Sequence, residues 1–292
     1  MVNGFLVIDK PVGLSSHDVV NRVRRILGIR KVGHTGTLDP FATGVLPVAV
    51  GEGTKAIQFL DEGLKEYRAV IRLGISTDTQ DITGSVLQEQ NPVGVSAELL
   101  QQQLVGLTGA ISQLPPMYSA VKQGGQPLYK LARKGVAVER QPRQVMIHHF
   151  DLLAFASPLA EVRVVCSRGT YVRTLADDLG RLLGCGACLS ELQRSISGPF
   201  NLDAALSLEQ LSELAAADRV AERLLLLPQL LTHLQSLEVT DDELQRLKNG
   251  VPPRQRLQEL SRGLIGLWYC GQLIAVAEKN EEGHIQLKRV FN

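Results

Sequence analysis

The chain has 292 residues, 44% of them hydrophobic and 21% charged, which is the ordinary composition of a globular protein with a real core. Its 31 basic residues almost balance its 30 acidic residues, which excludes a histone-like polycation, so any nucleic-acid partner must be bound by local basic patches. The four cysteines are too few for a disulfide scaffold, and we find neither a signal-peptide pattern nor a membrane-spanning apolar run. We therefore expect a cytoplasmic protein with no membrane partner.

The sequence pattern predicts a mixture of strands and helices along the chain. Alternating or continuous apolar runs predict strands at residues 5–9, 45–50 and 66–76 and a strand pair within 144–168. Apolar residues at helical spacing predict helices at residues 15–28, 54–60, 96–104, 170–184 and 240–250. Ser15 or Ser16 is the expected N-cap of the first helix, and Thr170 that of the fourth. Because strands and helices are interspersed and hairpin-like pairs are common, we expect an α+β fold with a mixed, largely antiparallel central sheet flanked by helices.

The C-terminal part of the chain has a different composition. A Leu-rich stretch ends near Pro228, and a polar helix and three short strands follow, with turns at Cys270–Gly271 and Asn280–Gly283. A β-rich module of this size is not stable unless it docks on the rest of the protein. We therefore divide the chain into a main domain of residues 1–235 and a C-terminal module of residues 236–292.

Three short motifs are similar to ligand sites but favour simpler interpretations. GEGTK (Gly51–Lys55) has the wrong order and spacing for a phosphate-binding loop, and a turn before a helix is the better interpretation. Cys185 and Cys188 have the spacing of half a zinc site, but they lack a second pair or a nearby histidine and are more typical of small semi-buried residues. His148 and His149 are adjacent on a predicted strand and are expected to point to opposite faces. We predict no metal site.

Two clusters of basic residues stand out in a chain of balanced charge. They contain Arg22, Arg24, Arg25, Arg30 and Lys31, and Arg133, Lys134, Arg140 and Arg143. A cluster of charge is usually just a solvated face. Two such clusters nevertheless favour a partner with a phosphate backbone.

One acidic residue, Asp39, lies in a long loop of glycines, threonines and prolines, GHTGTLDPFATGVLP (residues 33–47). Asp-Pro is typical of an ordinary turn, but this loop is far longer than a turn needs. Its glycines allow backbone N–H groups to approach a ligand, and a lone carboxylate suits a nucleophile or a base rather than the paired carboxylates of a glycosidase. If Asp39 works while ionised, it needs a nearby cation to lower its pKa, and Arg173 in SRGTYVRT is the candidate.

Six segments between Gly4 and Ser197 extend this pattern: DKPVGLSS, GHTGTLDPFATGVLPV, KEYRAVIRLG, TDTQDITG, PPMYSAVKQGGQPLYKLARKG and SRGTYVRTLADDLG. In their order and spacing they closely resemble bacterial TruB-type tRNA pseudouridine synthases. The resemblance implies a pseudouridine synthase fold and an isomerase of uridine 55 in the T-arm of tRNA. It implies tRNA as the partner, no obligate protein partner, and no cofactor or metal. Residues 236–292 are similar to the small PUA-like RNA-binding domain that ends many of these enzymes.

The resemblance assigns the reaction to three residues. Asp39 matches the catalytic aspartate, Arg173 the arginine paired with it, and Tyr67 the tyrosine that stacks on the target base and is a candidate to take its C5 proton. Isomerisation breaks the N1–C1′ bond and remakes it at C5, so the base must leave its stack. The aspartate either attacks C1′ or takes a proton from C2′, and both alternatives stay open.

Four further residues match the family's substrate pocket. Tyr171 matches a second pocket tyrosine and Leu192 a pocket leucine. His34 matches a histidine that helps to hold the rearranged T-loop, and Lys10 belongs to a motif that mainly supports the site. Cys188 stands where the family often has histidine, a departure that weakens the metal interpretation further.

Two other classes of function stay open from the sequence. One is a non-catalytic tRNA-binding or folding module, against which the joint presence of Asp39, Tyr67 and Arg173 argues, although an RNA-chaperone activity alongside catalysis is compatible with it. The other is an enzyme that acts on another RNA, against which the complete GHTG and SRGTYVRT motifs argue. Release of tritium from tRNA labelled at uridine C5 distinguishes an enzyme from a binding protein.

Overall fold

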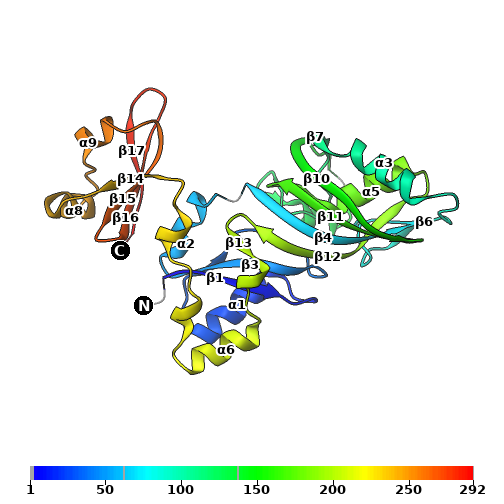
Figure 1. Cartoon of the computed structure of the whole chain (residues 1–292), viewed down its shortest axis with the longest axis horizontal. Helices are drawn as coiled ribbons and strands as arrows, with labels where there is room; N and C mark the ends of the chain where they lie inside the picture. The colour runs from blue at the N-terminus through cyan, green and yellow to red at the C-terminus, as the bar shows by residue number, and fades with distance from the viewer. Residues whose placement is uncertain (1–2, 62, 137, 292) are drawn as a thin grey trace.

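Most strands of the described residues form one large mixed sheet and a separate four-stranded sheet at the C-terminal end (Figure 1), and the rest form two small two-stranded sheets. The computed structural model describes residues 3–61, 63–136 and 138–291. Helices flank the large sheet, and nearly all of its neighbouring strands run antiparallel. The predicted α+β class is therefore confirmed.

The large sheet has nine strands in two halves. Its path runs through β1 (Gly4–Lys10), β3 (Thr43–Val50), β12 (Ala187–Ser197), β4 (Leu64–Leu73), β11 (Leu159–Ser167), β10 (Arg143–Ala156) and β7 (Gly109–Gln113), with β2 (Val32–His34) on β3 and β13 (Phe200–Asn201) on β12. The contact between β3 and β12 is parallel and short, with Gln193 opposite Thr43 and Arg194 opposite Gly44. This contact joins the two halves of the sheet.

Helices cover each half of the sheet. The longer ones are α1 (Ser16–Leu27) and α6 (Leu208–Ala216), which pack together beside β1, and α3 (Ala97–Gly106) and α5 (Val172–Leu182), which pack on the half that contains β10 and β12 (Figure 1). The shorter elements are α2 (Gly53–Ala56), η1 (Ile57–Phe59), β5 (Ile75–Thr77), β6 (Val86–Glu89), β8 (Lys122–Gln123), β9 (Gln126–Pro127), α4 (Leu128–Ala132), η2 (Leu202–Ala204), η3 (Val220–Arg223) and α7 (Leu227–Leu230). No helix of the described ranges is long and apolar enough to cross a membrane.

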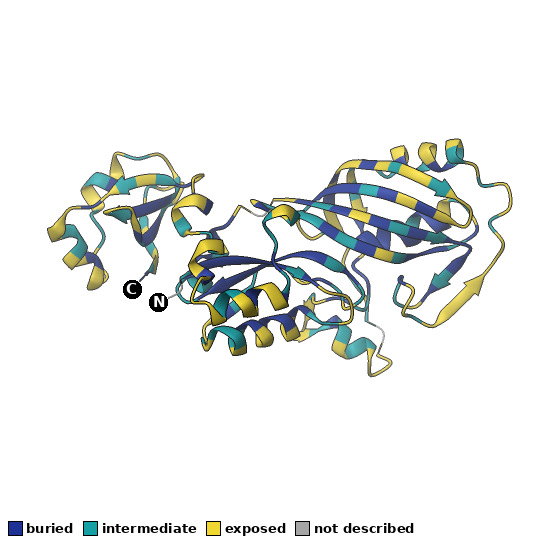
Figure 2. Cartoon of the chain, turned by 60° about the horizontal axis from the view of Figure 1, so that its bottom comes forward, coloured by how far each residue is buried: buried dark blue, intermediate teal, exposed yellow. Residues whose placement is uncertain are grey.

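Burial explains why the strands have two kinds of sequence pattern (Figure 2). In β1, Phe5 faces one apolar cluster and Leu6 faces another, so the strand is buried on both sides and its sequence is continuously apolar. In β4, Tyr67 and Ala69 face the main core while Arg68 between them is exposed, so the sequence alternates. Both patterns located a strand correctly from the sequence, although the predicted end of β4 differs.

Helix ends and strand ends differ in part from the prediction. Ser15 is the N-cap of α1, and its side chain and that of Asp18 form a reciprocal capping box. The N-cap of α5 is Tyr171 rather than Thr170. The Gln113 side chain hydrogen-bonds to both the N–H and the carbonyl of Tyr171, while the Thr170 hydroxyl donates to the Ser167 carbonyl. The prediction for Thr170 was wrong.

Two interruptions of regular strands were not foreseen. The strand predicted over residues 66–76 is broken at Gly74, which has a φ of +84° and separates β4 from β5. A register shift lies between Ile147 and His149 in β10, so His148 and His149 are both exposed instead of alternating. The expectation that the two histidines take opposite faces was therefore wrong.

The C-terminal sheet has four strands where the sequence predicted three. They are β14 (Gln235–Glu238), β15 (Gly263–Tyr269), β16 (Gln272–Lys279) and β17 (Ile285–Val290), accompanied by α8 (Asp241–Lys248) and α9 (Arg254–Gln258). The missed strand, β14, pairs parallel to β15. The sheet also shares an apolar cluster with the large sheet, in which Leu273, Val276 and Phe291 join Phe5 and Phe59. The predicted docking of this small module is therefore seen as a shared core.

Candidate active site

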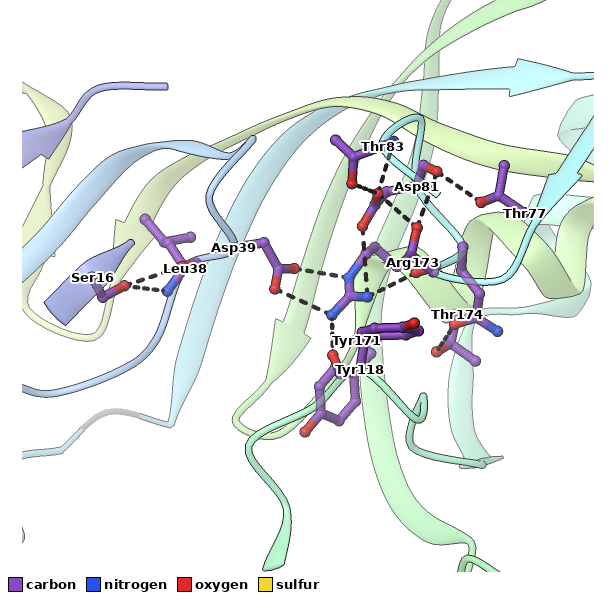
Figure 3. Close-up of polar contacts among 12 residues, drawn as sticks. Ser16, Leu38, Asp39, Thr77, Asp81, Thr83, Tyr118, Tyr171, Arg173 and Thr174 are labelled. Atoms are coloured by element: carbon purple, nitrogen blue, oxygen red, sulfur yellow. Dashed lines mark hydrogen bonds and ion pairs between the residues drawn. The ribbon is translucent and has the colours of Figure 1, made fainter. Parts of the chain in front are cut away.

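Asp39 lies in the connection between β2 and β3 and is held by the residues on either side of it. The Leu38 N–H donates to Ser16 Oγ at 2.8 Å, and the Ser16 hydroxyl approaches Leu38 O at 3.1 Å. On the other side, Lys10 Nζ donates to Pro40 O at 3.3 Å. The ends of β1 and α1 thus fix the backbone that carries the carboxylate (Figure 3).

Lys10 is a fully buried cation that the backbone satisfies. Besides Pro40, its ammonium donates to the carbonyls of Pro11 at 2.9 Å and Leu14 at 2.7 Å. Burial lowers the pKa of Lys10 to about 8, against the raising effect of Asp39. Its geometry favours the supporting role that the resemblance implies, since none of its surface is exposed to a ligand.

Arg173, at the start of α5, binds Asp39 side-on through two contacts. Its Nε lies 2.8 Å from Asp39 Oδ2, and its Nη2 donates to Oδ1 at 3.2 Å. Such a two-point pair fixes the orientation of both planar groups. The Arg173 side chain is 4% exposed, whereas 33% of the Asp39 side chain is open to solvent. The carboxylate therefore has a rigid partner on one side and access to a ligand on the other.

The remaining donors of the Arg173 guanidinium are also engaged. Nη1 donates to Thr79 O and Nη2 to Tyr118 O, each at 2.8 Å, and Nη1 lies 3.6 Å from Asp81 Oδ2 (Figure 3). The Asp39 loop, the segment with Thr79 and Asp81 and the segment with Tyr118 thus all contact the Arg173 side chain, which α5 carries. The guanidinium has no freedom to rotate without breaking several contacts.

Asp81 is a buried acid that sequence reasoning did not single out. Its Oδ1 accepts hydrogen bonds from the Thr79 hydroxyl at 2.9 Å and from the Thr83 N–H at 3.0 Å and hydroxyl at 2.5 Å. It lies in TDTQDITG, one of the segments that carry the resemblance to the family. The signal was present, because an acid between threonines that can donate to it is typical of a structured turn.

The environment raises the pKa of Asp39, contrary to the expectation that a cation would hold it low. Burial is the largest cause, Arg173 opposes it, and the negative charge of Asp81 adds to it. The cation predicted from the sequence is in place, but the removal of water and the second acid outweigh it. Asp39 is therefore a stronger base than an ordinary aspartate.

Tyr67 and Arg194 are cross-strand partners on β4 and β12 beside this pair. Tyr67 is 8% exposed, and burial raises the pKa of its hydroxyl, opposed by Arg194, which hydrogen-bonds to it. Arg194 is 2% exposed and donates to Val45 O at 2.8 Å and Gly36 O at 3.1 Å. This arginine was not predicted from the sequence, although an arginine on the inward face of a strand is a recognisable signal.

The contacts of Arg194 also correct the interpretation of the glycines in this segment. Gly44 has a φ of +99°, and a Cβ there would lie 2.3 Å from Arg194 O. A Cβ at Gly36 would lie 3.6 Å from Arg194 Nη1. Gly44 therefore makes room for the backbone of β12 rather than for a ligand, whereas a Cβ at Gly36 would make only ordinary van der Waals contact.

The structure fixes the other three residues named from the resemblance through their own elements. Tyr171 directly precedes α5, where Gln113 fixes it through hydrogen bonds of 2.8 and 3.1 Å. Leu192 faces the main core two positions before Arg194 on β12 and is 8% exposed. His34 ends β2, half-buried and paired with Val48 of β3. Of the residues named from the resemblance, Arg173 contacts Asp39 directly, and Lys10 and Tyr67 interact electrostatically with its carboxylate.

The cysteine pair is separate from this chemistry. Cys185 and Cys188 are both buried, and burial raises the pKa of the Cys188 thiol to about 11, which opposes the thiolate that a zinc site needs. Across the described residues no group of three or more His, Cys, Asp or Glu side chains is arranged to hold a metal ion.

An open hollow of about 480 Å³ lies on the surface near the start of the Asp39 loop. Thr35, Thr54, Ile57, Gln58 and Arg168 line it. Its lining combines the apolar side chain of Ile57 with polar groups and the exposed cation of Arg168. It is a candidate surface for part of a larger ligand.

Family models and curated relatives match the chain along its length. The model of the TruB family pseudouridylate synthase N-terminal domain matches residues 24–172, and that of the tRNA pseudouridylate synthase B C-terminal domain matches residues 173–240. The tRNA pseudouridine synthase B of Geobacter sulfurreducens is 49% identical over 304 residues, with 100% of both chains covered. That of Pseudomonas aeruginosa is 44% identical over 294 residues, covering 99% of this chain and 96% of the relative.

Solved structures show the same architecture. A crystal structure of a Cbf5–Nop10–Gar1 complex matches with a TM-score of 0.73 at 26% identity, covering 99% of this chain and 84% of that chain. A structure of an H/ACA RNP bound to a substrate RNA containing 2′-deoxyuridine matches with a TM-score of 0.72 at 23% identity, covering 99% and 85%, and supports the fold alone. The resemblance seen in the sequence motifs is confirmed, and the chain belongs to the TruB family of pseudouridylate synthases, which are isomerases.

Proposed function

We propose that this protein converts uridine 55 in the T-arm of tRNA to pseudouridine, with Asp39 as the catalytic residue. The observation that carries the proposal is the two-point pair of Asp39 and Arg173, with the ring of Tyr67 beside them and part of the carboxylate open to solvent. The names of relatives at 41–49% identity support tRNA as the substrate. A tRNA substrate agrees with the cytoplasmic location expected from the sequence.

The chemistry requires that the target uridine leave its stack and enter the site. The ring of Tyr67 supplies an aromatic face for the extruded base, and Leu192 and Tyr171 complete the pocket. Asp39 then either attacks C1′, which displaces N1, or takes a proton from C2′, which also releases the base. The base turns and C5 bonds to C1′, which expels the Asp39 carboxylate in the first case and requires return of the C2′ proton in the second. The C5 proton is then lost, and N1, which carried no proton in uridine, gains one. Atoms and electrons balance without an external reactant.

Each property of the site supports one need of this reaction. The raised pKa makes Asp39 basic, and Arg173 still stabilises its charge and fixes its direction. The raised pKa of Tyr67 keeps its hydroxyl protonated at neutral pH, so it takes a C5 proton only if it passes its own proton on.

We propose a division of labour between residues 1–235, which carry the chemistry, and residues 236–292, which act as a PUA-like RNA-binding module. The exposed basic residues support this division. Arg289 lies exposed on β17 near a second hollow of about 280 Å³, and Arg168 lines the hollow near the Asp39 loop. Both are placed to contact phosphates of an RNA larger than one nucleotide.

Tritium release from tRNA transcripts labelled at uridine C5 tests the proposal. We expect release from a wild-type transcript and none from a transcript in which uridine 55 alone is replaced by cytidine. Release that survives this replacement, but is lost when another single uridine is replaced, assigns a different site. Binding without release from any transcript would contradict an enzymatic function and favour the RNA-binding alternative.

A further inference from the structure

The loop of residues 77–84 contacts α5 through a second set of bonds besides those of Arg173. The Thr174 hydroxyl donates to Gln80 Oε1 at 2.9 Å, and Gln80 Nε2 donates to Asp177 Oδ2 at 2.9 Å. Thr174 and Asp177 are both buried, at 4% and 6% exposure. The amide of Gln80 therefore uses both its donor and its acceptor to connect the loop to one face of the helix.

The backbone of Gln80 has an unusual conformation. Its φ is +63°, in the left-handed region that favours glycine. Its N–H donates to Thr77 O at 3.2 Å, and its carbonyl accepts the Leu189 N–H from β12 at 3.0 Å. The backbone thus turns toward β12 while the side chain reaches α5. A glutamine at a backbone position that favours glycine indicates that its side-chain hydrogen bonds contribute to the structure or the function.

The residues on either side of Gln80 are those that hold Arg173. Thr79 O and the Asp81 carboxylate both contact Arg173 Nη1, at 2.8 and 3.6 Å. Arg173 directly precedes Thr174 on α5. The loop and the helix are therefore connected by two adjacent sets of contacts, one through Gln80 and one through the arginine that pairs with Asp39.

We propose that Gln80 is a positioning residue for uridine isomerisation. Its two side-chain bonds hold the loop at the distance from α5 at which Thr79 and Asp81 direct the Arg173 guanidinium toward Asp39. The backbone bonds to β12 remain without them, but on the α5 side the contacts of Arg173 then have to hold the loop, and the loop and the guanidinium shift together. A misplacement of about 1 Å costs up to about a hundredfold in rate. The inference rests on the proposed function, because the rate of isomerisation is its readout.

Two substitutions in the full-length protein separate the side chain from the backbone. Gln80→Ala removes both bonds, and Gln80→Gly removes them while it relieves the backbone strain. We expect both variants to lose about tenfold or more in the single-turnover rate of tritium release at saturating tRNA, with the dissociation constant for tRNA changed less than about twofold. Gln88→Ala, at an exposed glutamine on the nearby β6, is the matched control and should keep the wild-type rate.

Substitutions on the helix test the same contact from the other side. Thr174→Ser keeps the hydroxyl and should keep the rate within about twofold, whereas Thr174→Val should lose about as much as Gln80→Ala. Combining Gln80→Ala with Thr174→Val should give little further loss, because one interaction is removed twice. The Thr174→Ser and Thr174→Val variants test the positioning role of Gln80 even if a Gln80 variant does not fold.

Several outcomes overturn the positioning role. They are a wild-type rate in folded Gln80→Gly, a wild-type rate in Thr174→Val, and weaker tRNA binding with an unchanged saturated rate, which places the loop in RNA binding instead. The wild-type protein in the same assay tests the proposed function by itself. Absence of release by the wild type contradicts that function, whereas equal rates of the wild type and folded Gln80→Ala contradict only the role of Gln80.

Discussion

Asp39 and Arg173 lie 134 positions apart in the chain and form a side-on pair in which both carboxylate oxygens contact the guanidinium, at 2.8 and 3.2 Å. The pair bridges the loop before β3 and the start of α5, and therefore both halves of the large sheet. The arginine is buried and fixed, while the acid keeps an open side. This asymmetry leaves one side of the carboxylate open to a ligand.

Asp39→Asn should abolish turnover while tRNA binding persists. The substitution keeps the shape but removes the charge and basicity needed at the ribose, so we expect a loss of about a thousandfold or more in tritium release. Affinity for tRNA should change less than about tenfold, because binding is spread over many phosphate contacts. Filter binding and single-turnover release on the same preparation measure both. A variant that turns over at nearly the wild-type rate removes Asp39 from its role.

Arg173→Met should be nearly as damaging, and Arg173→Lys should not restore the wild-type rate. Methionine leaves Asp39 without its partner and leaves Thr79 O and Tyr118 O without theirs, at about 1–3 kcal/mol for each buried group. Lysine keeps the charge but cannot form the two-point contact. Thermal melts beside the rate measurement separate the loss of stability from the loss of catalysis. A fully active, folded Arg173→Lys contradicts the need for this geometry.

The acid limb of the pH–rate profile should lie above the ordinary aspartate value of 3.8. In the proposed reaction Asp39 acts in its ionised form, so activity should fall as the pH falls through its pKa, and a raised pKa moves that fall to higher pH. Asp81→Asn should shift the limb to lower pH, since the charge of Asp81 raises the pKa of Asp39. Single-turnover rates across the acid range measure both, and an unshifted limb in the folded variant contradicts the coupling.

Tyr67→Phe separates the two functions of one ring. Stacking on the base needs no hydroxyl, so a role in stacking alone predicts that phenylalanine keeps most of the activity. We expect instead a loss of about a hundredfold or more, because we assign the hydroxyl to the proton transfer at C5. Tyr67→Leu should be severe on either account. A mild leucine variant contradicts both roles.

Removal of residues 240–292 should lower stability as well as tRNA affinity. The truncation strips Leu273, Val276 and Phe291 from the cluster around Phe5 and Phe59, so we expect the melting temperature to fall by about 5 °C or more. The rate of the folded fraction at saturating tRNA should stay within about tenfold of wild type, because the residues around Asp39 remain. A folded truncation whose saturated rate collapses contradicts the division into a catalytic part and an RNA-binding part.

A single substitution avoids the loss of stability in that test. In the full-length protein, Arg289→Ala should weaken tRNA binding. It should also reduce the slope of the binding constant against salt concentration by the amount expected for about one phosphate contact. Arg219→Ala, at an exposed arginine that pairs with Glu222, is the control and should leave both unchanged. Equal salt slopes in Arg289→Ala and the wild type remove Arg289 from the RNA contact.

The sequence by itself determined the features that depend on local pattern. The apolar stripe of α1, the alternation of β4 and the pairing of β10 with β11 follow from side-chain periodicity, which acts over a few residues. The position of Asp39 as the one acid in the loop of residues 33–47 was also visible from the local sequence. The long, ordered motifs identified the family, which the comparisons confirm.

Only the tertiary structure decided how distant residues act on one another. The four-stranded C-terminal sheet needed β14, a short segment whose partner lies beyond two helices. The roles of Asp81 and Arg194 come from burial beside residues far away in the chain, which no local pattern reports. The direction of the Asp39 pKa shift depends on the balance between lost water, one cation and a second acid. Electrostatic energies depend on the distance between charges in space, and this distance cannot be read from their separation along the chain.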